Sequence, residues 1–158
     1  MKTLVAYFSA TGSTAKLAKT LAAAAAAELY EIRPAVPYER RDLNWMDKKS
    51  RTTLEMADPN CRPALADRDA PVAEAGRIFL GFPIWWYREP SIVDTFVEGN
   101  AAALAGKTVV PFATSGGSGM GDSTANLQAL APEAKVVEGR RFRASVSADD
   151  LKAWASEF

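Results

Sequence analysis

The chain of 158 residues contains no histidine and only one cysteine. Mechanisms that pair serine or cysteine with histidine are therefore excluded, as are zinc sites built on histidine or on several thiolates. If the chain is an enzyme, we therefore expect a cofactor to carry its chemistry. The single thiol, Cys61, excludes an internal disulfide and fits a reducing, cytoplasmic environment. Since no histidine is present to activate it, we interpret Cys61 as incidental.

The sequence also lacks an excess of charge of either sign and lacks long apolar runs. Basic and acidic residues both number 19, so the formal net charge is zero. This balance favours no nucleic-acid or membrane-surface partner, and it is unlike an electron carrier that docks by charge. The longest apolar run, residues 21–27, is too short to span a bilayer, and no secretory signal pattern is visible. We expect one cytoplasmic domain over residues 1–158, with small-molecule partners.

Apolar runs alternate with helical patterns along the chain. Strands are predicted over residues 3–8, 29–32, 77–82, 108–113 and 135–137. Helices are predicted over residues 13–27, from about 90 onward, 123–130 and 148–158, the last capped by Ser147. Because the strands are nearly continuous apolar runs separated by helices, the predicted fold is α/β. It is a doubly wound, five-stranded parallel sheet of order 2-1-3-4-5, with helices on both faces.

The first predicted strand enters a turn of small hydroxyl residues that opens a helix. The turn contains Ser9, Thr11, Gly12, Ser13 and Thr14. Its backbone N–H groups and hydroxyls lie at the positive end of the helix dipole, which suits a phosphate. No lysine or arginine lies in the turn, so a terminal phosphate monoester fits better than a nucleoside triphosphate. Alternatively, the hydroxyls only cap the helix, although four hydroxyls exceed what one cap uses.

Two further loops follow the third and fourth predicted strands. The first contains Pro83, Ile84, Trp85, Trp86 and Tyr87. Consecutive rings in a turn cannot all enter one core, so at least one is expected to face a flat ligand or a partner; alternatively, they plug the core. The second loop, residues 114–121, is glycine-rich but lacks the spacing of nucleotide-binding loops. In the predicted sheet all three loops meet at the carboxyl edge, where ligands bind.

A phosphate site, an aromatic slot and a backbone-lined wall together describe a pocket for FMN. The residues of these three loops resemble those of the flavodoxin-like FMN proteins, and the resemblance extends over nearly the whole chain. Within that family the chain resembles a bacterial subgroup with a characteristic middle segment. The resemblance assigns the phosphate to Ser9, Thr11, Gly12, Ser13 and Thr14. It places Pro83, Ile84, Trp85 and Trp86 along the isoalloxazine, with Tyr87 beside them. It assigns the pyrimidine side to Ser115, Gly116 and Gly117.

The sequence departs from the family pattern at three places. Ser13 stands where asparagine is common, and residues 116–119 replace the acidic, tyrosine-bearing loop of carrier flavodoxins. Tyr87 occupies a position often held by a small residue, which narrows the substrate slot.

Three functions fit these residues. The first is an FMN-dependent oxidoreductase that passes electrons from a reduced nicotinamide, NADH or NADPH, to a quinone-like or other small acceptor. The second is a flavodoxin that carries electrons without catalysis. The third is a module that binds a partner and holds no flavin. No catalytic side chain and no metal ligand are assigned.

A polar, proline-punctuated segment covers residues 34–71, which is long for a connection. A helix is predicted over residues 42–57, with Asn44, Asp47, Ser50 and Arg51 on one polar face and an Asp47–Arg51 pair. We interpret this face as solvated; the alternative is a lid that places Trp45 or Arg51 over the flavin. The segment also suggests a homodimer in which it completes the neighbour's site.

Overall fold

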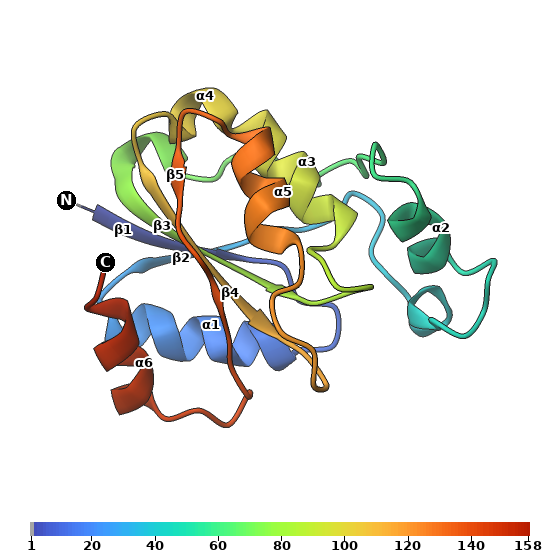
Figure 1. Cartoon of the computed structure of the whole chain (residues 1–158), viewed down its shortest axis with the longest axis horizontal. Helices are drawn as coiled ribbons and strands as arrows, with labels where there is room; N and C mark the ends of the chain where they lie inside the picture. The colour runs from blue at the N-terminus through green and yellow to red at the C-terminus, as the bar shows by residue number, and fades with distance from the viewer. Residues whose placement is uncertain (1) are drawn as a thin grey trace.

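Five parallel strand positions form the centre of the molecule, and helices cover both faces of the sheet (Figure 1). The computed structural model describes residues 2–158. In spatial order the strands are β2 (Glu28–Glu31), β1 (Lys2–Tyr7), β3 (Ala75–Pro83), β4 (Thr108–Thr114) and β5 (Lys135–Val136). A short strand, β6 (Arg140–Arg141), also pairs with β4, further along it than β5. The predicted fold class and strand order are confirmed, with the outer strand divided into two pieces.

Two apolar clusters hold the helices onto the sheet. Helices α1 (Ser13–Ala24) and α6 (Ala148–Ala155) cover one face, while α3 (Ser91–Gly99), α4 (Ala101–Leu104) and α5 (Ser123–Leu130) cover the other (Figure 1). Successive side chains of a strand point to opposite faces. Leu4 and Ala6 therefore join the α3–α5 side, and Val5 joins the α1–α6 side. None of the helices within residues 2–158 is both long and apolar enough to cross a bilayer.

Several predicted boundaries need correction. Helix α1 ends at Ala24, three residues early, because Ala26 adopts a left-handed φ of 52° before β2 begins. Helix α6 ends at Ala155 rather than at residue 158. Its predicted cap is confirmed, since the Ser147 hydroxyl accepts a hydrogen bond from the backbone N–H of Asp150. Strand β6 was not predicted, because two arginines carry no strand pattern.

The predicted helix over residues 42–57 is confirmed only over its last seven residues, and its predicted end at Ala57 is correct. The segment instead forms a 3₁₀ helix, η1 (Arg40–Leu43), and a separate helix, α2 (Arg51–Ala57); a further 3₁₀ turn, η2 (Val72–Glu74), precedes β3. The side chains of Asn44 and Asp47 accept hydrogen bonds from backbone N–H groups two residues on. Such local bonds compete with the helix, and Ser50 then caps a new one.

The polar face predicted for this segment therefore does not exist. Arg51 pairs with Glu55 at 3.0 Å rather than with Asp47, and its guanidinium lies 3.8 Å from the centre of the Tyr38 ring. Tyr38 donates a hydrogen bond to Glu55, and burial together with this carboxylate raises the pKa of the phenol. These contacts tie α2 to Tyr38, and the Thr52 hydroxyl donates to the carbonyl of Asp42 in η1 at 2.7 Å. Helix α2 lies beside the carboxyl edge of the sheet (Figure 1).

Candidate functional site

Hydrogen bonds tie together the loops that follow β1, β3 and β4. The hydroxyls of Thr14 and Thr114 share a hydrogen bond of 2.7 Å, and both side chains are buried. The backbone N–H of Ile84 donates to the carbonyl of Thr114 at 2.9 Å. The three loops therefore meet at one edge of the sheet, as the sequence predicts.

The turn before α1 leaves its donors open. Gly12 is the N-cap residue at φ 99°, and no side chain in the described chain caps the helix there. Instead, the Ser9 hydroxyl accepts a hydrogen bond from the Gly12 N–H at 3.1 Å, while Thr11 and Ser13 are exposed. The alternative that these hydroxyls only cap α1 does not describe this turn. Hydroxyls and backbone N–H groups at an uncapped helix start are donors suited to a phosphate.

The loop after β3 closes in a two-residue hairpin turn. Trp85 and Arg88 exchange backbone hydrogen bonds of 3.0 and 3.2 Å. The two residues between them, Trp86 and Tyr87, have left-handed φ values of 48° and 63°. Such turns favour glycine and asparagine. Holding bulky side chains there costs about 1–3 kcal/mol per residue, so the surroundings must stabilise the turn.

The glycine-rich loop after β4 supplies part of this support. The carbonyl of Tyr87 accepts a hydrogen bond of 3.0 Å from the backbone N–H of Asp122. The preceding residue, Gly121, has φ 57°, and a Cβ added there would overlap the Tyr87 carbonyl. Only glycine allows this close approach of the two backbones. Gly121 was not predicted as a site residue, and its place in the glycine-rich loop is the signal that could have indicated it.

The three consecutive rings have different surroundings. Trp85 is half-buried and packs edge-on against Phe8 and Tyr38, with ring centres 5.6 and 5.5 Å away. Trp86 and Tyr87 are 42% and 72% exposed. The interpretation that the rings plug the core thus describes Trp85 in part. Trp86 and Tyr87 lie outside the core, so their rings are accessible to a ligand or a partner.

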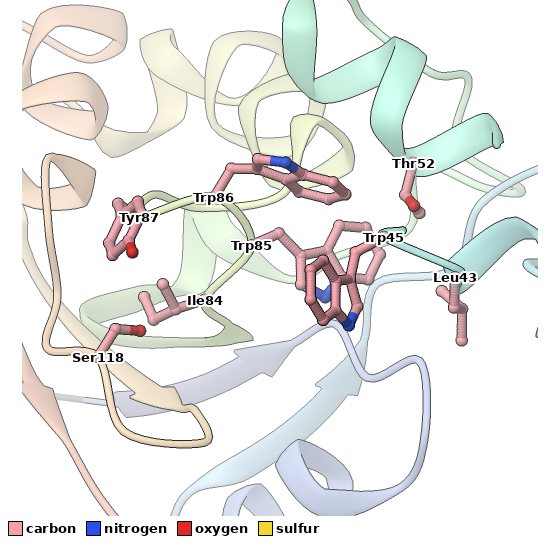
Figure 2. A pocket seen from close by; sticks show the side chains of 8 residues that line it. All are labelled: Leu43, Trp45, Thr52, Ile84, Trp85, Trp86, Tyr87 and Ser118. Atoms are coloured by element: carbon pink, nitrogen blue, oxygen red, sulfur yellow. The ribbon is translucent and has the colours of Figure 1, made fainter. Parts of the chain in front are cut away.

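A pocket of about 350 Å³ lies between this turn and the middle segment (Figure 2). Its lining residues are Leu43, Trp45, Thr52, Ile84, Trp85, Trp86, Tyr87 and Ser118. The three indoles gather in the centre of the view, between Leu43 and Thr52 on one side and Ile84 and Ser118 on the other. Among residues 2–158 no charged side chain lines this pocket. Its aromatic and uncharged lining therefore suits an uncharged group.

The predicted site residues do not all line one cavity. Ile84, Trp85, Trp86 and Tyr87 line the pocket, and Pro83 ends β3 just before it. Ser9 lines a neighbouring cavity of about 360 Å³ next to Phe8 and Tyr38.

The residues predicted to line the pyrimidine side do not line the pocket. The Ser115 hydroxyl donates to the Ser118 carbonyl within its own loop, and Gly116 and Gly117 have open space around them. Ser118 is the residue of this loop that lines the pocket.

The middle segment contributes three lining residues, and one of them, Trp45, was predicted as part of a possible lid. Trp45 is 70% exposed, and it lines the pocket beside Leu43 and Thr52. Arg51, the other lid candidate, is not among the lining residues. Leu43 and Thr52 were missed because their position depends on the break between η1 and α2.

The fold and this edge of the sheet define a doubly wound α/β protein with a ligand site at its switch point. A sequence model of the flavodoxin family matches residues 2–158, so the chain belongs to this family. The predicted family is confirmed. No functionally curated protein matches the chain significantly.

Solved structures show the same fold. A candidate flavoprotein from Bacteroides eggerthii is 46% identical, with 99% of this chain and 96% of that chain covered and a TM-score of 0.91. A second one, from Bacteroides uniformis, is 45% identical, with 98% and 97% covered and a TM-score of 0.89. A flavoprotein from Lactobacillus acidophilus in complex with FMN shares the fold at 18% identity, with 98% of each chain covered and a TM-score of 0.74.

Proposed function

We propose that this flavodoxin-family chain is an FMN-dependent oxidoreductase that passes electrons from NADH or NADPH to a small, flat acceptor such as a quinone. The cofactor follows from the family, since flavodoxins bind FMN. When bound, FMN supplies the redox chemistry that side chains without histidine or paired cysteines do not provide.

The residues present fit FMN. The uncapped start of α1, with the hydroxyls of Thr11 and Ser13 exposed, offers donors to a terminal phosphate. Ile84 and Trp85 offer a flat, apolar wall at the next loop along the same edge. The Thr14–Thr114 hydrogen bond fixes the phosphate turn relative to the third loop. These residues would bind and orient the cofactor.

The observation that carries the enzymatic proposal is the pocket between the Trp85–Arg88 turn and the middle segment. Its volume of about 350 Å³ is that of a small-molecule site. Its walls are aromatic and aliphatic with a few hydroxyls, which suits a neutral ring bearing carbonyl groups. A carrier, in contrast, presents its cofactor to a protein through a charged docking face, and this chain has zero net charge.

Two groups in the pocket wall give the acceptor a place and a proton. Trp45 offers an exposed indole face on which a flat ring can stack. The Tyr87 hydroxyl is in the same wall and is open to solvent, so it can donate a proton to a carbonyl oxygen and recover one from water.

The test is steady-state oxidation of NADH and NADPH by the FMN-loaded protein with a benzoquinone as acceptor. We expect quinone-dependent turnover. Trp45→Ala should raise the KM for the quinone about tenfold, corresponding to about 1.4 kcal/mol of lost stacking. Met46→Ala is the matched control, because Met46 is equally exposed but does not line the pocket.

Other outcomes assign the alternatives. FMN binding without turnover, together with a stable one-electron reduced state in a redox titration, would replace the enzyme with an electron carrier. Absence of FMN binding would leave a module that holds a partner in this pocket.

A further inference from the structure

Two acidic side chains are buried behind the Trp85–Arg88 turn. Glu89, immediately after the turn, is 0% exposed, and Asp94 in the first turn of α3 is 3% exposed. The Asn126 side chain donates to Glu89 Oε1 at 3.1 Å, and Arg88 Nη1 donates to Asp94 Oδ2 at 3.3 Å. Within the described chain, the other two oxygens, Glu89 Oε2 and Asp94 Oδ1, are buried without a hydrogen-bond partner. Buried polar atoms in this state require an explanation.

One proton explains both atoms. Both carboxyl groups lie against the same nitrogen atom, Arg88 Nη1, so the two acids are neighbours in one buried site. If both were ionised, each would only accept hydrogen bonds and they would repel. A proton on Glu89 makes it a donor to Asp94. Burial raises the pKa of Glu89 well above the ordinary range of a carboxyl, and the neighbouring Asp94 raises it further.

The polar and charged groups that face the acid pair come from the Trp85–Arg88 turn, the middle segment and helix α5. Arg88 Nη1 lies 3.8 Å from Glu89 Oε2, in addition to its bond to Asp94. Arg62 of the middle segment lies 3.9 Å from Asp94 and also pairs with the more exposed Glu98. Helix α5 contributes only the neutral Asn126. Arg62 also pairs with Glu98, so Arg88 is the main positive charge available to Glu89 and Asp94. A single negative charge on the two acids is balanced by the single positive charge of Arg88.

Arg88 connects this cluster to the pocket. Its backbone closes the hairpin turn with Trp85, and its Nη2 donates to the carbonyl of Met56 at 3.3 Å, near the end of α2. We propose that Glu89 and Asp94 share one proton, and that this acid pair positions Arg88 and thereby the left-handed Trp85–Arg88 turn that lines the candidate pocket. Loss of the proton would make the carboxylates repel and would displace Arg88.

The first test is the pH dependence of unfolding, which needs no ligand. Above the ordinary Glu pKa the unfolded chain releases the proton that the folded protein keeps. The unfolding equilibrium constant should therefore rise by up to tenfold per pH unit until the raised pKa of Glu89 is passed, and level off above it. Glu89→Gln should remove this rise, because its amide donates to Asp94 at every pH. Glu98→Gln, which changes an exposed acid on α3, the helix of Asp94, should keep it.

The second test follows FMN affinity by flavin fluorescence from pH 6 to pH 10, and this arm alone depends on the proposed function. In the wild type the Kd should rise at the alkaline end, and in Glu89→Gln it should stay constant. A Glu89→Gln protein that keeps the wild-type pH dependence of unfolding, or that fails to fold, would overturn the shared proton. Absence of FMN binding in both proteins would refute the proposed function, while the unfolding comparison would still decide the acid pair.

Discussion

Replacing Gly121 by alanine tests whether the loop after β4 holds the aromatic turn. The added Cβ would overlap the carbonyl of Tyr87, and the left-handed φ of 57° disfavours any side chain. The Tyr87 carbonyl must then move, and its hydrogen bond from the Asp122 N–H is stretched or lost. Because Tyr87 and Trp86 are themselves left-handed, the turn has no relaxed shape to move into.

The expected loss of stability is the sum of two effects. A left-handed alanine costs about 1–2 kcal/mol relative to glycine. The lost hydrogen bond adds about 0.5–1.5 kcal/mol. We therefore expect Gly121→Ala to lower the free energy of unfolding by about 1.5–3.5 kcal/mol and to weaken FMN binding at least tenfold, or about 1.4 kcal/mol.

Urea denaturation and FMN titration measure the two quantities. The matched control is Gly119→Ala in the same loop, where φ is not left-handed and a Cβ meets no atom within 4 Å. The control should unfold within about 0.5 kcal/mol of the wild type. A Gly121→Ala protein as stable as the control, with unchanged FMN affinity, would refute this account of the turn.

Two further predictions concern single polar contacts. Thr14→Val removes one partner of the buried Thr14–Thr114 hydroxyl pair; it should cost about 1–3 kcal/mol in urea denaturation, and a loss below 0.5 kcal/mol would contradict a structural role for the pair. Asp67 accepts hydrogen bonds from Tyr30 and Arg33, which lower its pKa to about 2. Since this is below the ordinary value, its contribution is present above about pH 4 and is lost as the pH falls toward 2. In Asp67→Asn the melting temperature should therefore fall less steeply between about pH 4 and pH 2 than in the wild type. An unchanged fall over that interval would contradict this prediction.

The sheet order and the meeting of the three loops were predictable from the sequence. Apolar runs such as residues 77–82 are long enough to be buried strands, and each is followed by a turn and a helical pattern. Parallel strands place such turns at one edge. The phosphate turn at residues 9–14 was visible for the same reason, because strand, turn and helix are contiguous in the sequence.

The shape of the middle segment was not predictable from helical spacing. Asn44 and Asp47 have side chains that bond to nearby backbone N–H groups, and this local competition ended the predicted helix. The position of Thr52 in the pocket depends on that break.

The Trp85–Arg88 turn was hidden for a different reason. Bulky residues rarely adopt positive φ, so nothing in the local sequence indicates it at Trp86 and Tyr87. The contacts that stabilise it come from Gly121 and Asp122, which are distant along the chain. The Glu89–Asp94 pair is equally invisible in the sequence, where two acidic residues at this spacing indicate a solvated surface.

The most direct test of the account is a titration of the purified, cofactor-free protein with FMN, followed by the quenching of flavin fluorescence. The account predicts saturable quenching with one FMN per chain, weakened by Thr11→Glu, which places a negative charge at the exposed start of α1. Absence of quenching, or quenching that Thr11→Glu leaves unchanged, would contradict the assignment of this turn to the FMN phosphate.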